Sequence, residues 1–196
     1  MRILIISTQR SGSTYLGRTL SDRYGLTYLH EPELMSSLVT SLDTLNNFCM
    51  KIVITQLYHY NQLNQNLSID ECTEYFYSIL SQYVFDKILI LDRRNEIEHI
   101  EATINLDRAR KNKDGFVEWA YDEKFINSIT SEEWNHWKIY TLKSKKWLNC
   151  ISEKFNIPII YYEDVYYDTN NVDLQGLEFN PDLSRKLRKN VKPSLI

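Results

Sequence analysis

Short apolar runs alternate with longer helical patterns along most of this chain, and the alternation limits the folds that it can adopt. The runs predicted to be β-strands are RILIIS (2–7), LTYLHE (26–31), CMKIVITQL (49–57), KILIL (87–91) and IPIIYY (157–162). The predicted helices cover residues 13–24, 34–45, 68–83, 95–110 and 130–155. Strands that alternate with helices favour an α/β sandwich, in which helices flank a mostly parallel central sheet.

Local signals support two of these elements. Ser68 is followed three residues later by Glu71, which is the spacing of a capping box, so a helix is predicted to begin here. The KILIL run is continuous and apolar, as is typical of strands buried on both faces of a parallel sheet. The predicted architecture is therefore a three-layer sandwich.

Length and composition favour one globular domain. Hydrophobic side chains make up 43% and charged side chains 25% of the 196 residues, an ordinary balance for a globular protein. No linker or repeat divides the chain, so a single domain is predicted over residues 1–196. No apolar run approaches the roughly 18 residues that a membrane-spanning helix needs, and ILII is too short for a signal peptide. We therefore expect a cytoplasmic protein.

The formal net charge of -3 limits the partners that the surface can attract. A net negative protein does not attract nucleic acid or anionic membranes, so we expect neither as a partner. Any bound anion must be held by a local group of donors.

The three cysteines suggest no cross-link or metal site. Cys49, Cys72 and Cys150 are widely spaced and form no C-x-x-C pair, so neither a disulfide framework nor a zinc site is predicted. We expect three buried thiols and no metal.

The loop after the first strand is suited to binding an anion. The segment STQRSGST (7–14) provides Gly12 for a turn and the hydroxyl groups of Ser11, Ser13 and Thr14. It also leads into the first turn of a helix, whose N–H groups have no partner within the helix. Ligands bind outside the carboxyl ends of the strands in such sheets. The loop is therefore a predicted cradle for a phosphate or a similar oxyanion.

Arginines stand where helix N-termini make cations unfavourable. Arg10 precedes one predicted helix, and Arg93 with Arg94 precedes another, each shortly after a strand. A helix N-terminus carries partial positive charge, so a cation there is unfavourable unless an anion lies between. One explanation is that these arginines point into solvent or pair with acidic residues of segment 92–98. A ligand with two separated anionic groups accounts for both positions together.

A nucleoside triphosphate is the first such ligand to consider. The pattern G-x-x-x-x-G-K-[ST] is absent, because no glycine stands five residues before Gly12 and no lysine follows it. Without that lysine, ATP loses its main β/γ-phosphate contact. An ATP site is therefore the second choice.

Four segments resemble sulfotransferases that use PAPS (3′-phosphoadenosine 5′-phosphosulfate), especially the carbohydrate and the bacterial or viral types. TQRSGSTYLGRTL (8–20) resembles their 5′-phosphosulfate-binding loop, and YLHEP (28–32) carries their E-P pair. ILILDRRNEIEHIEAT (88–103) resembles their 3′-phosphate-binding segment, and IIYYEDV (159–165) is similar to the end of their last strand. The resemblance implies a P-loop-like α/β fold.

The resemblance also implies a donor site. The residues that it assigns to the 5′-phosphosulfate are Arg10, Ser11, Gly12, Ser13 and Thr14. It assigns the 3′-phosphate to Arg93 and Thr103. The chain departs from the family in carrying Thr103 in place of the usual serine and in its doubled arginine. Arg94 is therefore an alternative to Arg93, which is nearer to the end of the strand.

Two residues are candidates for the catalytic base. Sulfuryl transfer needs in-line alignment, stabilised oxygen charge and removal of the acceptor's proton. Arg10 can stabilise the leaving phosphate without a metal. Glu31 of the E-P pair is the predicted base, and His30 competes with it. Neighbouring residues of a strand face opposite sides, so only one of the two is expected to reach the site. The structural alternative for Glu31 is a cap or an ion pair on the next helix.

The predicted activity is transfer of a sulfuryl group from PAPS to the hydroxyl of a small-molecule or carbohydrate acceptor. The alternatives are an ATP-dependent nucleotide or small-molecule kinase and a non-catalytic nucleotide-binding module. The sequence identifies neither the acceptor nor an oligomeric state. Trp134, Trp137 and Trp147 have the spacing of a buried helix face, which favours core packing over a sugar-binding platform.

Overall fold

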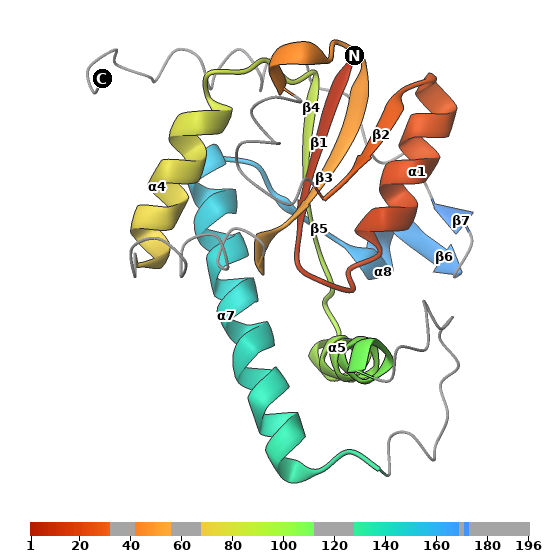
Figure 1. Cartoon of the computed structure of the whole chain (residues 1–196), viewed down its shortest axis with the longest axis vertical. Helices are drawn as coiled ribbons and strands as arrows, with labels where there is room; N and C mark the ends of the chain where they lie inside the picture. Colours follow the sequence, from red (N-terminus) through yellow and green to blue (C-terminus); the bar gives the residue numbers. More distant parts are fainter. Residues whose placement is uncertain (32–41, 56–67, 112–127, 169–170, 173–196) are drawn as a thin grey trace.

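A five-stranded parallel sheet forms the centre of the computed structural model, which describes residues 1–31, 42–55, 68–111, 128–168 and 171–172 (Figure 1). The strands are β1 Arg2–Ser7, β2 Thr27–His30, β3 Phe48–Val53, β4 Lys87–Asp92 and β5 Ile159–Tyr161. They lie in the order β2-β3-β1-β4-β5, and every neighbouring pair is parallel. All five carboxyl ends therefore meet at one edge of the sheet.

Helices cover both faces of this sheet, so the fold is the three-layer α/β sandwich that the sequence predicts. The helices are α1 Ser13–Tyr24, α4 Ile69–Leu80, α5 Glu96–Lys111, α7 Ser131–Phe155 and the short α8 Tyr162–Val165. Side chains of α4 and α7 share one core cluster with the sheet, and side chains of α1 share the other. A small antiparallel pair, β6 Tyr166–Asp168 and β7 Asn171–Val172, follows α8.

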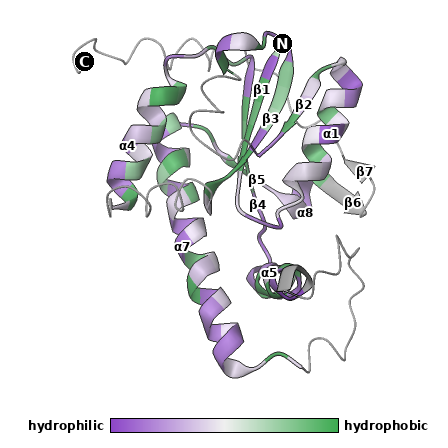
Figure 2. Cartoon of the chain, viewed as in Figure 1, coloured by the Kyte–Doolittle hydropathy of each residue, from purple (hydrophilic) through white to green (hydrophobic). Residues whose placement is uncertain are grey.

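Successive side chains of β1 point to opposite faces of the sheet and so belong alternately to the two core clusters. Leu4 and Ile6 pack with α4 and α7, whereas Ile3 and Ile5 pack with α1. All four side chains are 0% exposed, as expected for a strand covered on both faces. Figure 2 shows hydrophilic residues gathered on the N-terminal half of α7, which extends with α5 beyond the sheet edge.

Local sequence signals predict where the helices begin, whereas contacts with neighbouring elements determine where the strands begin and end. Ser68 and Glu71 form the predicted capping box at α4. Strand β5 begins later than predicted because Ile157 completes the end of α7: its amide donates to the Ser152 carbonyl, next to Asn156 in the left-handed conformation.

Other predictions have mixed outcomes. Most of the helix predicted over residues 34–45 lies outside the described residues. The cysteines are all free, and Cys49 and Cys72 are buried as expected. The expectation is wrong for Cys150, which is half-buried because its position on α7 is partly turned to solvent. Among the described helices, none combines the length and the apolar character needed to cross a membrane.

Candidate functional site

The loop between β1 and α1 lies at the edge where the strands end, on the side from which α5 and α7 extend (Figure 1). Two of its residues adopt the left-handed conformation: Arg10 has φ 58° and Gly12 has φ 79°. Gly12 is the N-cap of α1 and offers no side chain to cap it. The Leu16 amide makes the first helical bond, to the Gly12 carbonyl, so residues 13–15 present their amides ahead of it. The anion cradle expected from the sequence requires amides that are presented in this way.

The three hydroxyl groups of this loop differ in their surroundings. Ser11 is 0% exposed and donates to the Thr8 carbonyl at 2.8 Å, which braces the loop from within. Ser13 is buried and accepts a hydrogen bond from Ser7 at 2.8 Å. Thr14 is only half-buried. Of the three, Thr14 is thus the most accessible to a ligand, and Ser11 and Ser13 mainly stabilise the loop.

Lys51 is a site residue that the sequence analysis missed. It lies in β3 with only 4% of its surface exposed, forms an ion pair with Glu31 and donates to Thr14 Oγ1 at 2.7 Å. Burial lowers the pKa of Lys51, while the Glu31 carboxylate acts in the opposite direction. A single lysine in the apolar run FCMKIVI was the signal, because a buried ammonium requires partners. Lys51 joins the predicted base to the first turn of α1.

His30 and Glu31 both reach this lysine, so the expectation that only one of them faces the site is wrong. Strand β2 ends at His30, and Glu31 has φ 45°, which breaks the alternation of a strand. His30 Nε2 lies 3.5 Å from Lys51 Nζ and 3.8 Å from Glu31 Oε1. Burial and the Lys51 charge lower the pKa of His30, which favours its neutral form. Two candidate bases therefore lie side by side.

Arg93 is half-buried at the end of β4. Its guanidinium pairs with Glu98 at 2.5 Å and lies 5.0 Å from the centre of the Tyr162 ring. The buried Arg93 Nε has no hydrogen-bond partner within the described ranges. Arg93 thus makes an ion pair within segment 92–98, and its Nε is a donor without a partner among the described residues.

The chain's own carboxylates surround Arg94 and the start of α5. The Arg94 side chain pairs with Asp164 at 2.7 Å. The amides of Arg94 and Asn95 each donate to Glu163 at 2.8 Å. Burial raises the pKa of Glu163, but these hydrogen bonds outweigh it and hold the pKa below its ordinary value. Glu163 therefore occupies the anion position at this helix N-terminus. Of the two arginines, Arg93 is thus the better candidate to donate hydrogen bonds to a 3′-phosphate.

Thr103 is a buried residue of α5. Its side chain is 2% exposed, and its hydroxyl donates to the His99 carbonyl at 2.9 Å, one turn back along α5. Lys51 contacts both Thr14 and Glu31 and lies within electrostatic range of Arg10. Thr103, in contrast, faces the packed side of its helix.

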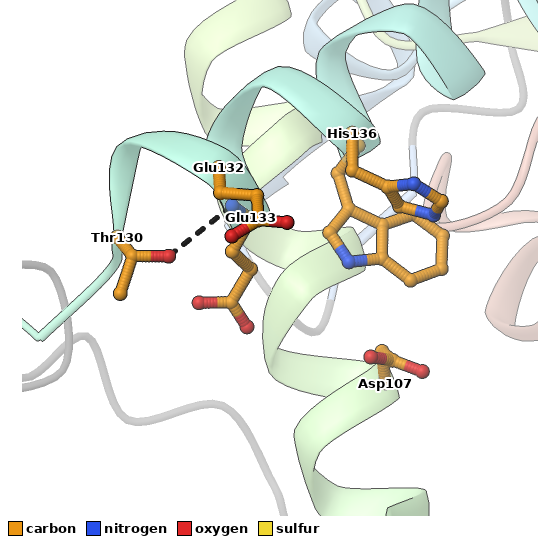
Figure 3. Close-up of a pocket in the computed structure, with 6 residues that line it drawn as sticks. Asp107, Thr130, Glu132, Glu133 and His136 are labelled. Carbon is orange, nitrogen blue, oxygen red and sulfur yellow. Dashed lines mark hydrogen bonds between the residues drawn. The ribbon is translucent and has the colours of Figure 1, made fainter.

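An open hollow of about 550 Å³ lies between α5 and the first two turns of α7 (Figure 3). The residues lining it are Asp107, Thr130, Glu132, Glu133, His136 and Trp137. Its three carboxylates make binding of an anionic ligand in this hollow unfavourable. Trp147 is in the core as expected, whereas Trp134 and Trp137 are only half-buried. The core prediction is thus wrong for these two, because their part of α7 extends beyond the sheet.

Comparison with protein-family models and with curated proteins finds no match for this chain.

Proposed function

We propose that this protein transfers a sulfuryl group from PAPS to the hydroxyl of a small-molecule or carbohydrate acceptor. The observation that carries the proposal is the contact chain from Glu31 through Lys51 to Thr14. It puts a carboxylate able to accept a proton beside the helix turn that follows the RSGST loop. The resemblance to sulfotransferases assigns roles to Glu31 and Thr14, and Lys51 is a residue that it does not assign.

The loop supplies the 5′-phosphosulfate site of the proposal. The amides of the first turn of α1 and the guanidinium of Arg10 bind the anionic oxygens, and Thr14 adds a hydroxyl. Gly12 allows the ligand to approach the backbone closely, since it has no Cβ. The Arg93 guanidinium takes the 3′-phosphate by exchanging Glu98 for it.

Glu31 acts as the base. It takes the proton of the acceptor hydroxyl while the acceptor oxygen forms its bond to sulfur and the bond from sulfur to the 5′-phosphate oxygen breaks. The electron pair of that bond leaves with the phosphate, whose charge Arg10 and the amides stabilise. Lys51 holds Glu31 in place and provides a second cation for the developing charge.

A kinase is the second candidate, and Lys51 is the observation that favours it. The loop lacks the lysine of ATP-binding loops, but the Lys51 ammonium reaches the same helix turn from β3. Such an enzyme would require Mg²⁺ and prefer ATP.

Calorimetric titration distinguishes the two. We expect adenosine 3′,5′-bisphosphate to bind tightly and ADP with Mg²⁺ to bind weakly. Arg10→Ala should weaken bisphosphate binding, whereas Arg23→Ala, an exposed arginine in the last turn of α1, is the matched control and should not. Tighter binding of ADP with Mg²⁺ supports the kinase, and binding of neither ligand contradicts both functions. Bisphosphate binding without sulfuryl transfer to any of a panel of hydroxyl acceptors supports a non-catalytic module.

A further inference from the structure

A polar cluster of the buried residues Asp92 and His99 with the half-buried Lys145 lies against the β1–α1 loop. Asp92 ends β4, His99 is on α5 and Lys145 is on α7. Asp92 accepts hydrogen bonds from the Thr8 hydroxyl at 2.7 Å and from Lys145 Nζ at 2.8 Å. The cluster therefore fastens the start of the loop to three elements.

His99 contacts the loop backbone itself. Its side chain is 2% exposed, and its Nε2 lies 2.5 Å from the Gln9 carbonyl oxygen. A carbonyl only accepts, so Nε2 carries the proton and Nδ1 of the neutral ring does not. Nδ1 lies 3.9 Å from Asp92 Oδ1 and has no hydrogen-bond partner among the residues that the structure describes. The histidine thus makes one strong hydrogen bond and leaves its other nitrogen unsatisfied.

An unsatisfied buried nitrogen costs free energy that an apolar side chain of similar size would avoid. In return, the histidine provides a hydrogen bond to the peptide unit between Gln9 and Arg10. The Gln9 side chain is also fixed, since its amide donates to Thr55 Oγ1 at 3.0 Å. The residue that follows, Arg10, has φ 58°, a conformation that non-glycine residues rarely adopt without support.

We propose that His99 is a positioning residue for the 5′-phosphosulfate loop. By donating to the Gln9 carbonyl, it holds the peptide before Arg10 in the orientation that the left-handed conformation of Arg10 requires. His99 acts through the backbone and touches neither the donor nor the acceptor. This inference rests on the proposed function, because it assigns the loop to the 5′ end of the donor.

The test compares two variants and two ligands. His99→Leu removes the donor, whereas the amide of His99→Gln can reach the same carbonyl. We expect His99→Leu to weaken binding of adenosine 3′,5′-bisphosphate about tenfold, and His99→Gln to restore most of the affinity. Adenosine 3′-monophosphate, which lacks the 5′ group, should bind the wild type and both variants equally. Urea unfolding of each variant shows whether it is folded.

Each other result overturns the inference in a recognisable way. Equal bisphosphate affinity in wild type and His99→Leu means that the hydrogen bond does not position the loop. Equal weakening of both ligands, or failure of His99→Gln to rescue, means that His99 has a general structural role. Binding of neither ligand by the wild type contradicts the proposed function itself, and the inference with it.

Discussion

The proposed chemistry depends most on Glu31 and on the ion pair that Glu31 forms with Lys51. Glu31→Gln keeps the size of the side chain and an oxygen for Lys51 but removes the base. We expect bisphosphate affinity to be retained and turnover to fall by roughly a hundredfold or more. Calorimetry and steady-state sulfuryl transfer measure the two quantities. The neighbouring His30→Gln is the control, and a larger loss of turnover in that variant would identify His30 as the base.

His99 should make stability depend on pH. Burial lowers its pKa from 6.5 to about 4, with Lys145 and Arg93 acting in the same direction and Asp92 and the Gln9 carbonyl against it. Between these values the unfolded chain binds a proton that the folded chain does not. The stabilisation that the neutral His99 gives to the folded chain is therefore complete above pH 6.5. It is lost as the pH falls towards 4, and the loss in unfolding free energy reaches about 3 kcal/mol.

The difference between wild type and His99→Gln isolates this effect from the carboxylates. Urea unfolding at about pH 7 and about pH 4.5 should give a larger loss of unfolding free energy in the wild type. The same loss in both proteins would show that His99 does not titrate in this range.

At the residue scale, local sequence could predict the loop but not its partners. The Arg10 to Thr14 segment carries its own turn glycine and precedes a helix, so its geometry is largely local. The pairing of Lys51 with Glu31 depends on β2 and β3 lying side by side, where His30 pairs with Lys51 in the register. The φ of Glu31 and the capping of α5 by Glu163 also arise from tertiary contacts, which a strand or helix pattern does not contain.

At the element scale, the capping box of α4 offers a clean measurement. Ser68→Ala removes the hydroxyl that accepts from the Glu71 amide, so we expect a loss of about 1 kcal/mol in unfolding free energy. Ser78→Ala, on an exposed position of the same helix, is the matched control and should change it by less than about 0.5 kcal/mol. Equal effects would mean that the cap is not formed in solution.

The elements differ in how well sequence predicts them because their ends have different causes. α1 and α4 begin where Gly12 and Ser68 stand, since caps are local. A strand ends where its neighbour stops pairing. Ile157 is apolar and precedes a strand, yet it belongs to the end of α7 because β4 pairs with β5 only from Ile159 onward.

At the scale of the whole molecule, donor binding depends on two arginines that the sheet brings to one edge. Arg10 follows β1 and Arg93 follows β4, and these strands are neighbours. We expect Arg93→Ala to weaken bisphosphate binding tenfold or more, because a charge-assisted hydrogen bond contributes about 1.5–3 kcal/mol. Arg94→Ala is the control. Its side chain is 57% exposed and pairs with Asp164, so about twofold at most is expected. The reverse order would assign the 3′-phosphate to Arg94.

The strand order also bears on how the chain folds as it is synthesised. The central strand β1 precedes both of its neighbours in the chain, and those neighbours are Phe48–Val53 and Lys87–Asp92. Until they have been made, the apolar side chains and backbone groups of β1 have no sheet to join, and exposed strands of this kind associate with other chains. The nascent protein therefore cannot complete the pairing of β1 until Lys87–Asp92 has emerged from the ribosome.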